Sequence, residues 1–289
     1  MIWRAATQDE IQAYYRDEFT QHLAARPAHI TTTGPRQYAL AFREPYPTRT
    51  DGRPPRDFIR RDTRTADGQS EYFDHMGDVL DFIRNPVRND PLDDLADPDT
   101  VDQREPVPDA VYYALDHWTR SWLIMVDIDA KDIARNRARH ILEAEAVDPD
   151  DLTSDELFTK AGIRDGLPNG YPYEFTDIQT AIEQGFEVAD VFETRFNAEE
   201  TQVFYTGQGV HVYLYDDDPD HAWDAASREV LNTILTERYG IAVDEQVTAD
   251  RRRVARLPGS LHADVSRIVT PIDSPRFDPR TDATPEFLA

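Results

Sequence analysis

The chain has 289 residues, 39% of them hydrophobic, and its 31 basic and 56 acidic residues give a net charge of −25 at pH 7. No segment approaches the roughly 18 apolar residues that a membrane-spanning helix needs, and the first ten residues lack the order of a signal peptide, so we expect a cytoplasmic protein. The sequence contains no cysteine, which excludes disulfides and thiolate zinc sites within it and leaves oxygen and imidazole as metal ligands.

The acidic charge is accompanied by a near absence of lysine, which occurs only at positions 131 and 160. A net charge of −25 repels phosphate unless salt screens the field of the protein. A salt-rich cytoplasm supplies that screening, so we expect a haloarchaeal or halophilic viral source, with an ordinary acidic mesophilic protein as the alternative. In a high-salt source, local arginine clusters say more about partners than the total charge does.

The first half of the chain predicts one helix and four strands. Residues 7–25 have the pattern of a helix, because Thr7 and Glu10 stand in capping-box spacing and Pro27 follows the end. Residues 36–62 predict two strands joined by an irregular loop, and residues 86–108 predict an exposed loop rich in Asp and Pro. Two further strands are expected between residues 110 and 130. The second of these, residues 122–128, is nearly all apolar, which is typical of a central strand covered on both faces.

The second half alternates helices and strands. We expect helices at 130–146, 176–196 and 219–239, a weaker helical stretch after the acidic turn at 148–156, a strand pair about a glycine turn at 202–216, and β segments between 251 and 272 before a proline-rich tail. Mixed α/β is therefore the expected fold class. The expected organisation is one domain over residues 1–289, which can also be read as two intimate lobes, roughly 1–115 and 116–273, with a tail at 274–289.

The sharpest chemical signal is the segment VDIDAKD, in which Asp127 and Asp129 end an apolar strand. Because side chains alternate along a strand, these two carboxylates point to the same side. Two carboxylates so close repel each other, and a divalent cation such as Mg²⁺ or Mn²⁺ would offset that repulsion. The alternative is that the pair caps the helix that begins near Ala130.

A second signal is the segment YTGQGVHVYLY. Gly207 and Gly209 allow a tight turn and a close approach of the backbone to a ligand, Thr206 offers a hydroxyl, and His211 follows on the next strand. This group could cradle phosphates. Taken alone, the segment fits a plain hairpin with a half-buried histidine better.

A third signal runs from Asp244 to His262. It contains another carboxylate, an arginine cluster at 251–253 and 256, and a histidine after a Pro-Gly turn. Arginine suits triphosphate binding because its planar guanidinium offers several donors in a fixed geometry. The alternative is that these arginines form ion pairs with neighbouring carboxylates.

Taken together and in this order, the three segments resemble the three motifs of the archaeo-eukaryotic primase small subunit. The matching residues are Asp127-Ile128-Asp129, the glycine turn that ends in His211, and Asp244 followed by Arg256-Leu-Pro-Gly-Ser-Leu-His262. The segments RQYALAF, FIRR and DAVYY are similar to upstream segments of that family. The resemblance covers about residues 30–273, and it is far more specific than any one motif.

The resemblance implies an α/β catalytic core with an RRM-like sheet and an N-terminal α/β unit. It implies that Asp127, Asp129 and Asp244 bind two divalent metal ions, Mg²⁺ or Mn²⁺. His211 and the turn residues Thr206, Gly207 and Gly209 would contact the phosphates of the incoming nucleotide. Arg256 and His262 would complete that pocket, and Arg60 would be a further phosphate or sugar contact. The implied partners are a single-stranded DNA template, nucleoside triphosphates and a primase large subunit, with no membrane.

The sequence also departs from the family pattern. Primase small subunits usually carry a Cys/His zinc-binding insert between the first two motifs, whereas this chain has no cysteine, so no structural zinc is expected. The glycine turn is one residue shorter than the common form, and Gln208 stands where basic residues are frequent.

These features predict a DNA primase catalytic subunit, an enzyme that makes short primers by two-metal nucleotidyl transfer. A primase-polymerase or an end-joining repair polymerase shares the same motifs and is the first alternative. A non-catalytic accessory protein that binds single-stranded nucleic acid is the second.

Overall fold

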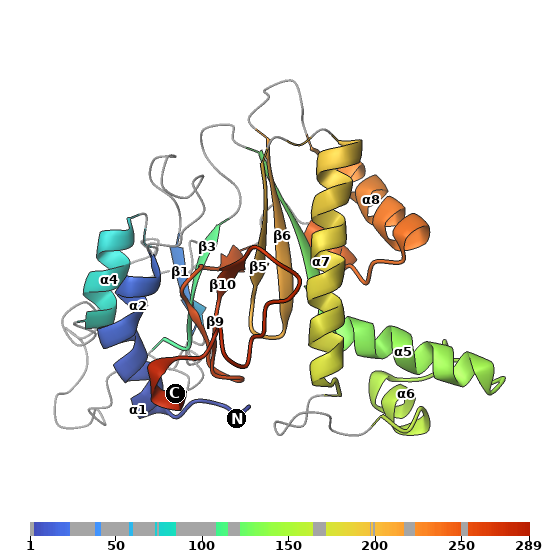
Figure 1. Ribbon diagram of the computed structural model, residues 1–289, viewed down its shortest axis with the longest axis horizontal. Helices are drawn as coiled ribbons and strands as arrows, with labels where there is room; N and C mark the ends of the chain where they lie inside the picture. The colour runs from blue at the N-terminus through green and yellow to red at the C-terminus, as the bar shows by residue number, and fades with distance from the viewer. Residues whose placement is uncertain are drawn as a thin grey trace, which may run out of the picture.

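The computed structural model describes residues 3–23, 38–41, 58–59, 73, 75–84, 108–114, 122–163, 172–196, 198, 200–216, 223–249 and 254–289. These residues form a mixed α/β structure, as the sequence predicts. Helical segments lie on both sides of the β-strands, with α1, α2 and α4 at one end of the molecule and α5 to α8 at the other (Figure 1). Among the described helices, none combines the length and the apolar character that crossing a membrane requires.

The helical segments are α1 (Gln8–Ala13), the π-helical turn η1 (Tyr14–Glu18), α2 (Phe19–His22), α4 (Met76–Arg84), α5 (Ala130–Ala144), α6 (Ser154–Lys160), α7 (Phe175–Arg195), α8 (Ala225–Thr233), the π-helical turn η4 (Ile234–Arg238), α9 (Glu245–Ala249) and the 3₁₀ turn η5 (Glu286–Leu288). The strands are β1 (Tyr38–Ala41), β2 (Phe58–Ile59), β3 (Ala110–Ala114), β4 (Trp122–Asp129), β5 (Glu200–Tyr205), β6 (Gly209–Asp216), β7 (Val254–Arg256), β8 (Leu261–His262), β9 (Arg267–Ile268) and β10 (Thr270–Ile272).

The strands form two four-stranded antiparallel sheets. The first sheet has the order β2-β1-β3-β7 and the second has the order β10-β5-β6-β4, while β8 and β9 pair separately. Two of the expected pairs are therefore present, because β1 pairs with β2 and β5 pairs with β6 across the glycine turn.

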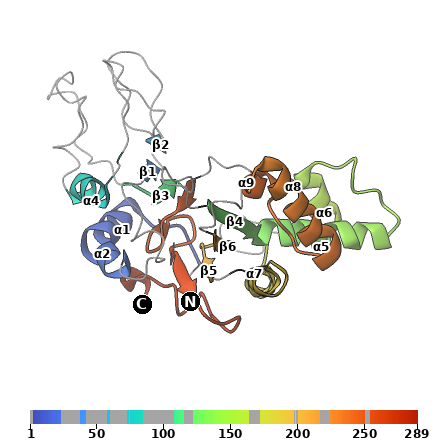
Figure 2. The same cartoon turned by 90° about the horizontal axis from the view of Figure 1, so that it is seen from above.

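The second sheet is buried on both faces because it separates two apolar cores. Ile124, Val126 and Ile128 of β4 belong to the core that contains α5, α6 and α7. Met125 of β4 belongs to the core that contains the N-terminal helices and the first sheet. Seen from above, β4, β5 and β6 lie between these two groups of helices (Figure 2). The alternation of side chains along the strand thus sends odd-numbered residues of β4 toward the first sheet.

The expectation that residues 122–128 form a central strand is wrong for the described residues, because β4 is the last strand of its sheet. Its apolar composition reflects burial of both faces, not a strand neighbour on each side. The outer edge is covered by other structure, since the backbone N–H of Asp244 donates to the carbonyl of Asp127 at 2.8 Å and α9 packs against β4.

The predicted helices are present with small shifts at their ends. Thr7 and Glu10 form the expected capping box, with the Thr7 N–H donating to Glu10 Oε2 at 2.8 Å. The helix expected from residue 219 begins at Ala225, where Asp224 caps it, and the turn at Gly240 has a φ of +70°. α4 and α9 were not predicted. Residues 24–25, most of the 86–108 loop and residues 219–222 lie outside the described residues.

The close pairing of β4 with β6 predicts that a side chain at position 209 destabilises the folded protein. A Cβ atom at this position would lie 2.1 Å from the carbonyl oxygen of Ile128, so Gly209→Ala must push the two strands apart. We expect the free energy of unfolding to fall by roughly 2 kcal/mol or more, as in other overpacked sites, in urea denaturation followed by circular dichroism. Gly77→Ala is the control, because Gly77 lies in α4 with no atom within 4 Å of its Cβ position. Equal stability of the two variants would contradict this pairing register.

Candidate active site

The register of β4 and β6 places two of the predicted motifs side by side. Asp127 lies opposite His211, and Asp129 lies opposite Gly209. The N–H of Ala130 then donates to the carbonyl of Gln208 at 2.9 Å, which holds the glycine turn against the start of α5. Gly209 permits this pairing because its missing side chain lets β6 approach the backbone of β4 closely.

Asp244 brings the third motif to the same place. Asp127, Asp129 and Asp244 each offer one carboxylate oxygen, and these three atoms lie within 4.8 Å of one another. Asp127 is buried and the other two are half-buried. Asp244 also caps α9 through the N–H of Val247, which donates to Asp244 Oδ1 at 3.1 Å. We call these three residues the carboxylate trio.

Helix capping does not account for the first two carboxylates. Asp129 occupies the N-cap position of α5, but its side chain makes no capping hydrogen bond. Its carboxylate instead pairs with the ammonium of Lys131, which also lies 3.6 Å from Asp132. Asp127 lies before the helix, within β4. The alternative interpretation of the DxD segment as a simple cap is therefore not supported by the geometry.

The electrostatics of the trio suit a divalent cation. Burial raises the pKa of Asp127 well above its usual range, and the charges of Asp129 and Asp244 raise it further. Asp127 Oδ1 is buried and has no hydrogen-bond partner among the described residues. Carboxylate oxygens are the ligands that Mg²⁺ and Mn²⁺ prefer, so the residues present fit such an ion. A bound cation would stabilise all three ionised carboxylates.

Lys131 and Asp132 are site residues that the sequence motifs did not identify. Lys131 is half-buried, and although burial lowers its pKa, the charge and hydrogen bond of Asp129 raise that pKa more. Lys131 therefore stays protonated and partly neutralises the trio. The sequence did contain a signal for these two residues, because both lie in the first turn of the helix that directly follows Asp127 and Asp129.

His211 faces the trio from β6. It is buried, and its Nδ1 lies 2.9 Å from the hydroxyl of Tyr213. Its Nε2 lies 3.5 Å from Asp127 Oδ1, which is a contact too long for a good hydrogen bond. Burial, and then the charge of Arg256, lower the pKa of His211 to about 3. The imidazole is therefore neutral near pH 7.

The glycine turn packs against the segment that ends in His262. Gly207 has a φ of +108°, and a Cβ atom there would lie 2.6 Å from the Cβ of His262. The N–H of Thr206 donates to the carbonyl of Gly209 at 3.0 Å, which closes the turn. Thr206 and His262 are both buried. The second and third motifs are therefore in direct contact, and their role as a phosphate pocket stays a prediction.

Arg256 comes from the first sheet. It lies on β7 opposite Tyr112 of β3, and its guanidinium carbon is 5.5 Å from the centre of the Tyr112 ring. Its buried Nε has no hydrogen-bond partner among the described residues. The guanidinium is thus held by packing and placed close enough to act on the pKa of His211. Arg60 and the arginines at 251–253 lie outside the described residues.

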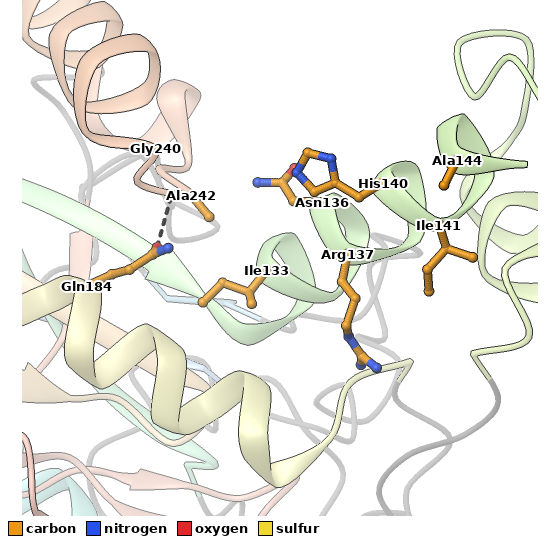
Figure 3. Close-up of a pocket in the computed structure, with 9 residues that line it drawn as sticks. All are labelled: Ile133, Asn136, Arg137, His140, Ile141, Ala144, Gln184, Gly240 and Ala242. Atoms are coloured by element: carbon orange, nitrogen blue, oxygen red, sulfur yellow. Dashed lines mark hydrogen bonds between the residues drawn. The ribbon is translucent and has the colours of Figure 1, made fainter. Parts of the chain in front are cut away.

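A cavity of about 560 Å³ lies elsewhere, between α5, α7 and the segment 240–242 (Figure 3). Ile133 and Ala242 in its wall belong to the core on the other face of the second sheet from Met125 and Asp127. Arg137, in the same wall, pairs with Asp177 at 2.8 Å. The cavity is therefore separate from the carboxylate trio, although both border α5.

No family model matches the chain. An uncharacterised DNA primase small subunit-like protein of Archaeoglobus fulgidus is 29% identical over 136 residues, which are 44% of this chain and 45% of that protein. The DNA primase small subunit of Picrophilus torridus is 42% identical over 66 residues, and that of Halorubrum lacusprofundi is 49% identical over 47 residues. These two matches cover 21% and 15% of this chain and 18% and 12% of the relatives.

These relatives support the inference that the chain is related to the archaeo-eukaryotic primase small subunits. The chain spans less than half the length of each of these curated relatives. Their names agree with the family that the three motifs resemble.

The arrangement of the carboxylate trio predicts that Asp127→Asn stabilises the protein without metal and weakens its stabilisation by metal. Asp127→Asn removes a carboxyl group whose ionisation is disfavoured by burial and by the charges of Asp129 and Asp244, so we expect the free energy of unfolding in EDTA at pH 7 to rise by about 1 kcal/mol or more. The same change removes an anionic ligand, so stabilisation by Mn²⁺ should be largely lost. Thermal and urea unfolding with and without Mn²⁺ measure both effects.

Asp151→Asn is the matched control, because Asp151 is exposed and lies outside the trio. It should behave as the wild type in both conditions. Undiminished stabilisation of Asp127→Asn by Mn²⁺ would exclude Asp127 as a ligand.

Proposed function

We propose that this chain is the catalytic core of a DNA primase small subunit, which synthesises short oligonucleotide primers on a single-stranded DNA template. The observation that carries the proposal is the convergence of Asp127, Asp129 and Asp244 beside His211. These residues come from three separate segments, in the order in which the family carries its motifs. The small-subunit relatives support the same conclusion.

In this proposal the second sheet is the RRM-like sheet of the primase core, and the first sheet with the N-terminal helices is the N-terminal α/β unit. The trio would hold two Mg²⁺ or Mn²⁺ ions. When bound, such ions supply charge neutralisation on the triphosphate and activation of the attacking hydroxyl. Reaction then depends mainly on positioning and on charge stabilisation, and no covalent enzyme intermediate is needed.

The remaining residues would bind the incoming nucleotide. The glycine turn, with Thr206, Gly207 and Gly209, offers backbone and hydroxyl groups next to the trio, and His262 packs against the turn. His211 is a neutral donor, and Arg256 supplies a positive charge for the triphosphate. The proposed partners are the template, nucleoside triphosphates and a primase large subunit, in a high-salt haloarchaeal or viral source.

Synthesis on circular single-stranded DNA tests this function. With Mn²⁺ or Mg²⁺, nucleotides and molar KCl, we expect labelled products from the wild type without any added primer. Asp129→Ala should make no product while keeping its circular dichroism spectrum, and exposed Asp151→Asn should be fully active.

The same assay separates the alternatives. Products only when a primer is annealed would favour a primase-polymerase or an end-joining polymerase over a primase. Binding to the template without any incorporation would favour the accessory protein. Near-normal activity of Asp129→Ala would refute catalysis at the trio.

A second prediction separates nucleotide contacts from template contacts. His211→Ala and Arg256→Ala should each lower kcat/KM for the nucleotide by about 10²-fold, which corresponds to roughly 3 kcal/mol of lost charge stabilisation. Affinity for the template should change little. Nucleotide kinetics and template affinity are measured separately across a salt series.

The controls for this prediction match the two residues in type. Arg238 also lies over a tyrosine ring, at 5.7 Å, but is exposed on η4, and His140 is exposed on α5. Their alanine variants should keep normal nucleotide kinetics. A defect in template affinity, with a salt slope lower by about one and normal nucleotide kinetics, would instead assign Arg256 to a template groove.

A further inference from the structure

Two buried polar side chains of α8 hold α9, the short helix that begins directly after Asp244. The side-chain amide of Asn232 donates to the carbonyl of Glu245 at 3.0 Å. Nη1 of Arg228 donates to the carbonyl of Thr248 at 3.4 Å. Arg228 and Asn232 are each 4% exposed, and because they are four residues apart on α8 they lie on the same face of that helix. Each end of α9 is thus bonded to α8.

α9 depends on such contacts for its position. It has five residues, Glu245–Ala249, whereas an isolated helix needs about 12 residues or more to be stable in water. The last carbonyls of a helix lack partners within it, so the donors from α8 satisfy groups that α9 itself leaves unpaired. α9 contacts α8 and also β4, and it lies beside α8 in Figure 2. These two neighbours therefore fix where the helix lies.

Asp244 is bonded to both β4 and α9. Its backbone N–H donates to the carbonyl of Asp127 at 2.8 Å. Its own carbonyl accepts from the N–H of Thr248 at 3.1 Å, and its Oδ1 accepts from the N–H of Val247 at 3.1 Å. A movement of α9 would therefore move the carboxylate of Asp244 relative to Asp127 and Asp129.

Stability alone does not explain the asparagine at position 232. The Oδ1 of Asn232 is buried and has no hydrogen-bond partner among the described residues, and burying an unpaired polar atom costs free energy. The adjacent Leu231 belongs to the apolar core. A leucine at 232 would be close to asparagine in size and would bring no polar atom into this place. What asparagine adds is the hydrogen bond to α9.

We propose that Asn232 is a positioning residue that, together with Arg228, holds α9 and thereby keeps Asp244 in place beside Asp127 and Asp129. This inference rests on the proposed function, in which the three carboxylates bind divalent metal ions. Asn232 acts on the trio through the backbone of α9, so its effect is on the geometry of the site.

Amide hydrogen exchange of Asn232→Leu, measured by NMR in EDTA, tests the anchoring without metal or activity. We expect the N–H groups of Asp244 and Thr248 to exchange roughly five- to tenfold faster than in the wild type, which is the effect of one lost neutral hydrogen bond. Both rates are divided by that of Val212, which lies within β6 between β4 and β5, so that a change in global stability cancels. The melting temperature should not fall. Unchanged exchange ratios would overturn the proposal.

Asn232→Ala separates the hydrogen bond from packing. It removes the same amide but leaves a cavity, so we expect a lower melting temperature with the same exchange ratios as in Asn232→Leu. Normal exchange ratios in either variant would show that packing, and not the hydrogen bond, holds α9, and would overturn the role of Asn232.

A metal-binding arm connects the anchoring to the trio. Electron paramagnetic resonance of Mn²⁺ should give a Kd roughly fivefold higher for Asn232→Leu than for the wild type. Val188→Ala is the matched control, because Val188 is fully buried in the same core on α7; it should lower the melting temperature and leave the Kd unchanged. An equal loss of Mn²⁺ affinity in the control, or faster exchange at Asp244 with an unchanged Kd, would overturn the link to the trio.

The two arms fail separately from the proposed function. A wild type that binds no Mn²⁺ would refute the metal centre on which the proposed function depends. The exchange ratios in EDTA would still decide whether Asn232 holds Asp244 in place.

Discussion

The antiparallel pairing of β4 with β6 is the interaction on which the rest of the site depends. It sets Asp127 opposite His211 and Asp129 opposite Gly209, so that groups from two distant segments share one end of a sheet. A shift of one residue would turn Asp127 and His211 to opposite faces. The register is held because even-numbered residues of β4, such as Val126, must enter one core while Met125 enters the other. Burial of both faces thus makes the alignment of the site a consequence of folding.

The site also has an energetic cost that folding must offset. Three carboxylates lie together, burial disfavours the charge of Asp127, and the buried Oδ1 of Asp127 lacks a hydrogen-bond partner among the described residues. Lys131 provides partial neutralisation, and the neutral state of His211 adds no competing positive charge. Such an arrangement is unfavourable for stability alone and favourable for binding a divalent cation.

The sequence alone predicted the parts of this structure that depend on local pattern. The spacing of Asp127 and Asp129 requires a shared face on any strand, and Thr7 with Glu10 requires a capped helix start. α4 was missed although Met76, Val79, Leu80 and Ile83 have helical spacing. That pattern of apolar residues was a sufficient signal for a helix.

Other features depend on contacts between distant segments. The apolar run of β4 predicts a central strand, but composition reports which faces are covered and not how many strands are adjacent. The proximity of Asp244 to the first two aspartates followed only from the family resemblance, because no local pattern encodes it.

The central claim is that the carboxylate trio is a divalent metal centre, and anomalous diffraction from Mn²⁺-soaked crystals tests it most directly. Data collected on both sides of the manganese absorption edge would locate bound ions independently of any activity. We expect manganese peaks coordinated by Asp127, Asp129 and Asp244, with Lys131 displaced from Asp129. Manganese peaks elsewhere in the crystal, with none at the trio, would show that the trio is not a divalent metal centre.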